Sequence, residues 1–142
     1  MMTYPALFQP DPKGGILVKF PDFGHATHGD NQADACAMAQ DLLVAMLSDL
    51  IAGKRDIPAP GQVRGKRVQP VMVPALVAAK VELYQQLRAA HITKAELARR
   101  MGQAKQQVER LFDLRRYSRF DQIEAAFAAL GKQIAIEIRD AA

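Results

Sequence analysis

The sequence predicts an α+β protein, with a strand-and-helix module at residues 1–73 and a helical domain at residues 74–142. Two patterns support this class. In the first module, short segments place apolar residues at every second position, which is typical of half-buried strands. In the second, apolar residues recur every three or four positions, as they do on the buried face of a helix.

Charge is also distributed unevenly along the chain. Residues 1–60 carry four basic residues against seven aspartates, which gives a net charge of −3. Residues 61–142 carry fifteen lysines and arginines against eight acidic residues, which gives a net charge of +7. Such asymmetry predicts two halves with different partners, one basic and one polyanionic.

Four strands are expected in the first module, at residues 4–9, 16–20, 25–28 and 68–73. The first two should form a hairpin, because Asp11, Pro12 and Gly14 suit a type I turn between them. In the fourth strand, Pro70 cannot donate a backbone hydrogen bond. That strand is therefore expected at an edge of the sheet or at a bulge.

A long helix is predicted between the third and fourth strands, so the order is βββαβ. Asp30 or Asn31 is a suitable N-cap residue, and Gly53 ends the helix. Cys36 is expected to be a small core residue on this helix. The predicted buried stripe consists of Ala35, Met38, Ala39, Leu42, Met46 and Leu50.

The helical domain begins at Pro74, which suits a first helical turn because its missing N–H would be unpaired there. The inner stripe of this first helix is Leu76, Ala79, Leu83 and Leu87. The last helix is expected to start with a capping box formed by Ser118 and Asp121. Its predicted buried residues are Phe120, Ile123, Phe127 and Leu130.

Residues 93–112 predict a helix-turn-helix motif. Thr93 and Glu96 form a capping box, in which each side chain satisfies a free backbone N–H. Gly102 suits the end of the first helix, and Ala98 is small enough for two helices to cross closely. The hydrophobic anchors are Leu97, Met101, Val108, Leu111 and Phe112. An ordinary helical hairpin is the simpler alternative.

The candidate DNA-binding residues lie mainly on the outward side of the second of these helices and in the basic loop that follows. Glutamine, lysine and arginine can hydrogen-bond base edges in the major groove, and clustered arginines can hold phosphates. For the loop, a solvated basic segment is the alternative interpretation. The candidates are Lys94, Gln103, Lys105, Gln106, Glu109, Arg110, Arg115, Arg116 and Tyr117.

Catalysis, metal binding and cofactor binding are not expected. A two-metal nuclease site needs carboxylates that converge, and the spacing of the aspartates does not require convergence. His25 and His28 have no further histidine or cysteine nearby to complete a metal site. The aspartates considered are Asp11, Asp22, Asp30, Asp34 and Asp41.

Composition favours a cytoplasmic protein without membrane contact. Cys36 is the only cysteine, so no internal disulfide can form, and a reducing compartment fits best. No uninterrupted apolar run approaches the roughly 18 residues expected of a membrane span. The N-terminus lacks the basic and then apolar pattern of a signal segment.

The C-terminal segment Gln133–Arg139 is a strand by composition and alternation. It follows a helical domain, which offers no neighbouring strand to bond its backbone. A lone strand of this kind needs a pairing partner.

Several runs of residues resemble the HicB family of antitoxins. They are Tyr4–Ala6, Gly14–Asp22, Thr27–Asp30 before an alanine-rich helix, and Val71–Pro74 leading into the helix-turn-helix. The resemblance covers nearly the whole chain. One departure is Gly24-His25-Ala26, which is one residue shorter than the family's loop and has histidine in place of its Pro-Gly-Cys cysteine.

The resemblance implies that residues 1–73 form a truncated RNase H-like module that occludes a HicA-type toxin, a small basic mRNA-cleaving ribonuclease. Residues 74–142 would bind palindromic operator DNA and repress the protein's own operon. The terminal strand, through Ile134, Ile136 and Ile138, would pair with the same strand of a second subunit, giving a dimer or a tetramer. Two alternatives stay open: a stand-alone transcriptional regulator with a ligand-sensing N-terminal module, and a residual metal-dependent nuclease.

Overall fold

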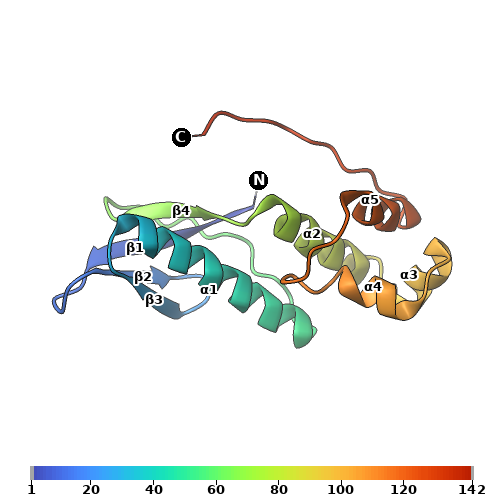
Figure 1. Ribbon diagram of the computed structural model, residues 1–142, viewed down its shortest axis with the longest axis horizontal. Helices are drawn as coiled ribbons and strands as arrows, with labels where there is room; N and C mark the ends of the chain where they lie inside the picture. The colour runs from blue at the N-terminus through green and yellow to red at the C-terminus, as the bar shows by residue number, and fades with distance from the viewer. Residues whose placement is uncertain (1, 142) are drawn as a thin grey trace. The chain divides into compact units, whose positions relative to one another are not determined.

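The structure, a computed structural model, describes residues 2–141 and divides into two compact units. The first unit runs up to Ala78 and the second from Ala79 onward. The chain passes from one to the other within helix α2 (Ala75–Ala89), shown in Figure 1. The division predicted between residues 73 and 74 falls just before this helix.

The first unit is an antiparallel sheet with one long helix. Its strands have the order β3-β2-β1-β4 in the sheet, and helix α1 (Gln32–Ala52) lies across one face (Figure 1). Along the chain, three strands precede α1 and one follows it, so the predicted βββαβ order of elements is confirmed. Along β1, alternate side chains from Tyr4 to Phe8 are buried, as the period of two required. The strands are β1 (Thr3–Pro10), β2 (Ile16–Phe20), β3 (His25–Gly29) and β4 (Val68–Met72).

The β1–β2 turn and the edge position of β4 agree with the predictions for this sheet. The Gly14 N–H donates to the Asp11 carbonyl at 2.9 Å, which closes the β1–β2 turn. The Lys13 N–H donates to the Asp11 side chain at 2.9 Å. Strand β4 ends the sheet order, so Pro70 lies on an edge strand as expected.

The buried face of α1 differs in part from the predicted stripe. Its buried residues are Ala35, Ala39, Leu43, Met46, Leu47 and Ile51. Met38 is 39% exposed, Leu42 and Leu50 are half-buried, and Cys36 is exposed rather than a core residue. Periodicity could not select the face because apolar residues surround most of this helix.

Close packing between β3 and α1 helps to fix that face. A Cβ atom at Gly29 would lie 2.3 Å from the Ala35 backbone nitrogen, so only glycine allows this approach. The helix then starts at Asn31, whose side chain accepts from the Asp34 N–H at 2.9 Å. The Asp34 carboxylate accepts in return from the Asp30 N–H at 2.8 Å.

Helix α1 differs from the expectation that no segment of the chain is long and apolar enough to span a membrane. By length and composition it is long and apolar enough to cross a membrane, whereas no such segment was predicted. About a third of its most apolar window, 33%, is buried. Its buried residues contact the sheet, which is the arrangement of a core helix.

The second unit is helical. After α2 it contains α3 (Lys94–Met101), α4 (Lys105–Arg110) and α5 (Phe120–Ala129). Among the predicted anchors, Met101 is half-buried and the others are buried. Helix α5 starts one residue later than expected, with Arg119 as N-cap and no side-chain cap. The Ser118–Asp121 capping box is therefore wrong, because the Asp121 carboxylate accepts instead from Arg119 at 2.5 Å.

The predicted C-terminal strand is not formed in this single chain. Residues 132–141 have no regular secondary structure and follow α5 as an extended segment (Figure 1). Among the described residues no strand pairs with this segment, so its backbone has no ladder to join. Ile134 is half-buried, Ile136 is 72% exposed and Ile138 is 89% exposed. Pairing with a second subunit stays a prediction.

Candidate nucleic-acid interface

Helices α3 and α4 are joined by a tight turn at Gly102. The Thr93 hydroxyl accepts from the Glu96 N–H at 3.1 Å, which caps the start of α3. Gly102 has φ 65°, the left-handed conformation predicted for the end of that helix. Leu97 and Val108, one from each helix, are fully buried. These features place the start of α4 at the surface, three residues after Gly102.

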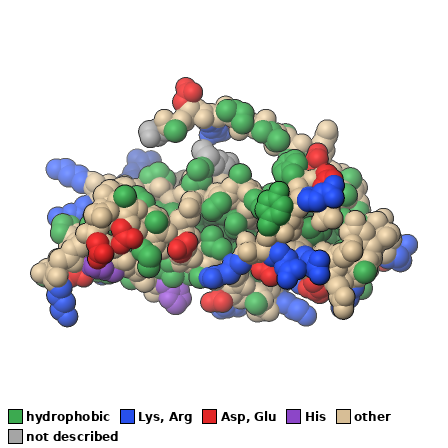
Figure 2. All heavy atoms as spheres, viewed as in Figure 1, with side chains coloured by type: hydrophobic (Ala, Val, Ile, Leu, Met, Phe, Trp, Pro, Cys, Tyr) green, Lys and Arg blue, Asp and Glu red, His purple; other side chains and the backbone are tan. Residues whose placement is uncertain are grey.

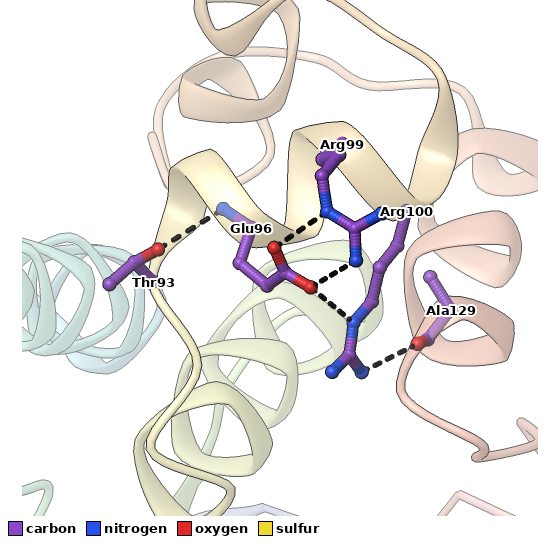
Figure 3. Close-up of polar contacts among 5 residues, drawn as sticks. All are labelled: Thr93, Glu96, Arg99, Arg100 and Ala129. Atoms are coloured by element: carbon purple, nitrogen blue, oxygen red, sulfur yellow. Dashed lines mark hydrogen bonds and ion pairs between the residues drawn. The ribbon is translucent and has the colours of Figure 1, made fainter.

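The predicted capping box also required the Glu96 side chain to accept from the Thr93 N–H. That side chain is bound by two arginines instead (Figure 3). The Glu96 carboxylate accepts from Arg99 Nη2 at 2.6 Å and from Arg100 Nε at 3.1 Å rather than from the Thr93 N–H. Arg100 also donates to the Ala129 carbonyl at 3.3 Å, which joins α3 to the end of α5. The hydrogen bonds from Arg99 and Arg100 lower the pKa of Glu96 to about 2.

A buried lysine on α2 holds the segment that follows α4. Lys80 is 0% exposed. Its ammonium donates to the carbonyls of Arg110 at 3.1 Å, Asp113 at 2.8 Å and Arg116 at 2.6 Å. Burial lowers the pKa of Lys80 from its usual 10.5, and the Asp113 carboxylate opposes that shift.

These hydrogen bonds give a second donor to the Arg110 and Asp113 carbonyls, which already accept from the Asp113 and Arg116 N–H groups, and they supply a donor to the Arg116 carbonyl in the following turn. The backbone that carries Arg110 and Arg116 is thereby fixed. Sequence reasoning missed Lys80, although a signal was present. It lies four residues after Leu76 and three before Leu83, on the same helical stripe.

Two of the predicted DNA-binding residues form a contact with each other. Lys94 on α3 and Glu109 on α4 form an ion pair of 2.9 Å. The Lys94 ammonium also lies 5.0 Å from the centre of the Phe112 ring. This pair joins the two helices and leaves neither side chain free of a partner.

The remaining candidates form an open polar and basic surface. Figure 2 shows lysine and arginine side chains gathered on the visible face of this unit. Gln103 is half-buried in the turn before α4. Tyr117 is 80% exposed. The exposed residues of this surface are Lys105, Gln106, Arg110, Arg115, Arg116 and Tyr117. Such a surface can donate hydrogen bonds to base edges and phosphates.

Potential metal ligands do not cluster in residues 2–141. No group of three or more His, Cys, Asp or Glu side chains within that range is placed to hold a metal ion. His28 Nε2 lies 2.8 Å from the Gly14 carbonyl oxygen and 3.7 Å from the Asp11 carboxylate. It therefore contacts the β1–β2 turn.

Comparisons with known proteins point in one direction. Residues 3–82 match the family described as HicB_like antitoxin of bacterial toxin-antitoxin system. The chain is 37% identical to Antitoxin HicB 1 of Photorhabdus laumondii over 138 residues, covering 96% of this chain and 87% of that protein. It is 35% identical to Antitoxin HicB of Escherichia coli K12 over 136 residues, covering 95% and 98%.

A solved structure described as "Toxin-Antitoxin complex from Streptococcus pneumoniae" is also similar. It shares 21% sequence identity, with a TM-score of 0.45, and the match covers 76% of this chain and 93% of that one.

Replacing Lys80 by methionine should destabilise the protein. The substitution removes the Lys80 donor from three carbonyls, of which that of Arg116 has no other donor among the described contacts, so the free energy of unfolding should fall by on the order of 1–3 kcal/mol. The lowered pKa means that the folded state binds this proton less tightly than the unfolded state. The stability of the wild type relative to Lys80→Met should therefore rise as pH increases toward 10.5. Urea denaturation measures both effects; Lys132→Met, at an exposed position, is the control.

Replacing Glu96 by glutamine should lower Tm in a pH-dependent way. The pKa of Glu96 is about 2 in the folded protein against a usual 4.5, so its stabilising effect is present above 4.5. That effect is lost as pH falls toward 2. Thermal unfolding at several pH values should show the two proteins converging near pH 2. A difference in Tm that is constant with pH would contradict this role, and Glu124→Gln on α5 provides the comparison.

Proposed function

Because the chain belongs to the HicB-like family of antitoxins of bacterial toxin–antitoxin systems, we propose that it neutralises a HicA-type toxin with its first unit and represses its own operon with its second. The protein then performs no reaction itself. It occludes a cytoplasmic ribonuclease and binds operator DNA, so we place it in the cytoplasm. The sheet and helix α1 supply the toxin-binding module, with the topology of a truncated RNase H-like fold.

The surface of α4 and the loop after it carries the DNA-binding part of the proposal. Lys105 and Gln106 are exposed at the start of α4, the part that enters the major groove when α3 and α4 act as a helix-turn-helix. Arg115 and Arg116 are exposed in the loop, where they would contact phosphates. The three carbonyl contacts of Lys80 favour this role because they fix the loop backbone before DNA is bound.

The Lys94–Glu109 ion pair changes the roles that we assign to those two residues. Both side chains are engaged with each other across α3 and α4. A paired lysine and glutamate would have to separate before either could contact a base. We therefore assign them to the positioning of α4, and keep base contact for Gln106 and phosphate contact for Arg116.

Dimerisation completes the proposal. The exposed Ile136 and Ile138 belong to a segment with strand-forming composition and no strand partner in the described chain. Pairing with the same segment of a second copy would satisfy the backbone and bury these side chains. A two-fold dimer would also match a palindromic operator with half-sites about one helical turn apart. Two such dimers would form a tetramer.

Replacing Gln106 and Arg116 separately by alanine should separate base contact from phosphate contact. Gln106→Ala should cost about 1–3 kcal/mol on the operator and relax the preference at one base pair. Arg116→Ala should weaken all sequences alike and reduce the salt slope by roughly one unit. Fluorescence anisotropy with operator and scrambled DNA across salt concentrations measures both. Equal losses on both DNAs for Gln106→Ala would place the base contact elsewhere, at Gln103 or Gln107.

Replacing Ile136 by aspartate should disrupt the dimer. The change would place an unpaired charge in the inter-subunit sheet, where burial is costly. Light scattering should then show a smaller particle than for the wild type. Lys132→Asp, just before the segment, tests whether any added carboxylate has this effect. An unchanged mass for Ile136→Asp would show that the dimer forms elsewhere.

A further inference from the structure

A groove runs between the first half of α1 and the edge strand β4. Its volume is about 230 Å³. The lining mixes apolar side chains with polar groups: it includes Ala37 and Gln40 from the helix, Phe8 from β1, and Gln69, Pro70 and Met72 from the edge strand. Gln40 crosses from α1 to β4 and donates to the Met72 carbonyl at 2.9 Å. Met72 is 50% exposed, so the groove is open to solvent at its rim.

The helix beside this groove has more apolar surface than its contacts with the sheet account for. Its composition would suit a membrane span, yet only 33% of its most apolar window is buried. Met38 is 39% exposed, and Ala33 and Ala37 are exposed as well. Figure 2 shows hydrophobic side chains interspersed with acidic ones over this part of the first unit. An apolar face of this kind is typical of an interaction surface.

The charges on the same helix are of one sign. Between Gln32 and Ala52 the helix carries Asp34, Asp41 and Asp49 and no lysine, arginine or histidine. Asp41 is exposed and follows Ala37 by four residues, so it lies on the same side of the helix as the groove. A partner with a basic surface would complement these carboxylates, whereas the anionic surface of a membrane would not.

The adjacent edge of the sheet is poorly suited to accept another strand. Pro5 and Pro70 are opposite each other in the β1–β4 ladder, and neither has an N–H to share. The proline in β4 therefore leaves the outer edge without a donor at that position. The Met72 carbonyl is already bound by Gln40. A partner at this edge would therefore insert a side chain into the groove rather than add a strand.

We infer that the groove between α1 and β4 is the docking site for the toxin, which would insert an apolar side chain beside Ala37 and place basic residues against Asp41. This inference rests on the proposed toxin-binding function and adds the location and the chemistry of the contact. The apolar side chains of the lining would provide the buried centre of the interface, and Asp41 would provide a charge at its rim.

Binding of the full-length chain to a catalytically inactive HicA-type toxin tests the inference. Ala37→Arg fills the mouth of the groove, and Asp41→Lys reverses the charge at its rim. Each should raise the Kd for the toxin by about tenfold or more in isothermal titration calorimetry. Glu124→Lys makes the same charge change at an exposed position of α5 and should leave the Kd within about twofold of the wild type. Thermal unfolding checks that each variant is folded.

Cys36 allows the same question to be asked of the unmodified protein. This cysteine is exposed, lines the groove and is the only one in the chain. Its alkylation, followed by mass spectrometry, should slow by about tenfold or more when the toxin is bound at saturation. If the wild type binds the toxin, the variants keep its Kd and Cys36 is not protected, then the proposed location of the docking site is wrong while the proposed function stands. Absence of toxin binding by the wild type would overturn the proposed function as well.

Discussion

The three hydrogen bonds of the Lys80 ammonium organise the helical unit. A buried lysine is costly because burial removes the hydration of its charge, and that cost is reduced only when its hydrogens find acceptors. Here the acceptors are the carbonyls of Arg110, Asp113 and Arg116. They belong to the end of α4 and the turn after it, where backbone hydrogen bonds also link Asp113 to Arg110 and Arg116 to Asp113. The lysine and the loop therefore stabilise each other, and the exposed side chains of the loop project from a fixed backbone.

The first unit depends on a different constraint, which is the close approach of α1 to β3. Gly29 permits this approach because it has no Cβ atom, and Asn31 then caps the helix immediately afterwards. The helix covers one face of a four-stranded sheet and buries one of its own sides. The opposite side of α1 keeps apolar and acidic residues at the surface. This incomplete burial is the structural basis of the binding role that we propose for the unit.

Acidic and basic residues are also distributed unevenly between the two units. The acidic N-terminal residues include all three charges of α1, and the basic C-terminal residues include the exposed arginines after α4. In the second unit, the acidic residues nearest the basic surface are engaged locally. Glu96 is bound by Arg99 and Arg100, and Glu109 by Lys94. The lysine and arginine side chains that remain exposed there suit a polyanionic partner.

The sequence by itself determined the features that depend on neighbouring residues. Turn chemistry at Asp11, a helix cap at Asp30 or Asn31, and the left-handed Gly102 were all predicted, because each is set by a few adjacent side chains. The βββαβ order of elements along the chain was also predicted, as was an edge or bulge position for Pro70. The tertiary structure decided what depends on distant residues. Helix α1 is apolar around most of its circumference, so only packing on the sheet chose its buried face and left Cys36 exposed. The Glu96 carboxylate was predicted to accept from the nearby Thr93 N–H, but it accepts from Arg99 and Arg100 instead. From the sequence alone, Lys80 would be assigned to the surface, because its carbonyl partners lie 30 or more residues away in the chain and meet it only in the folded structure.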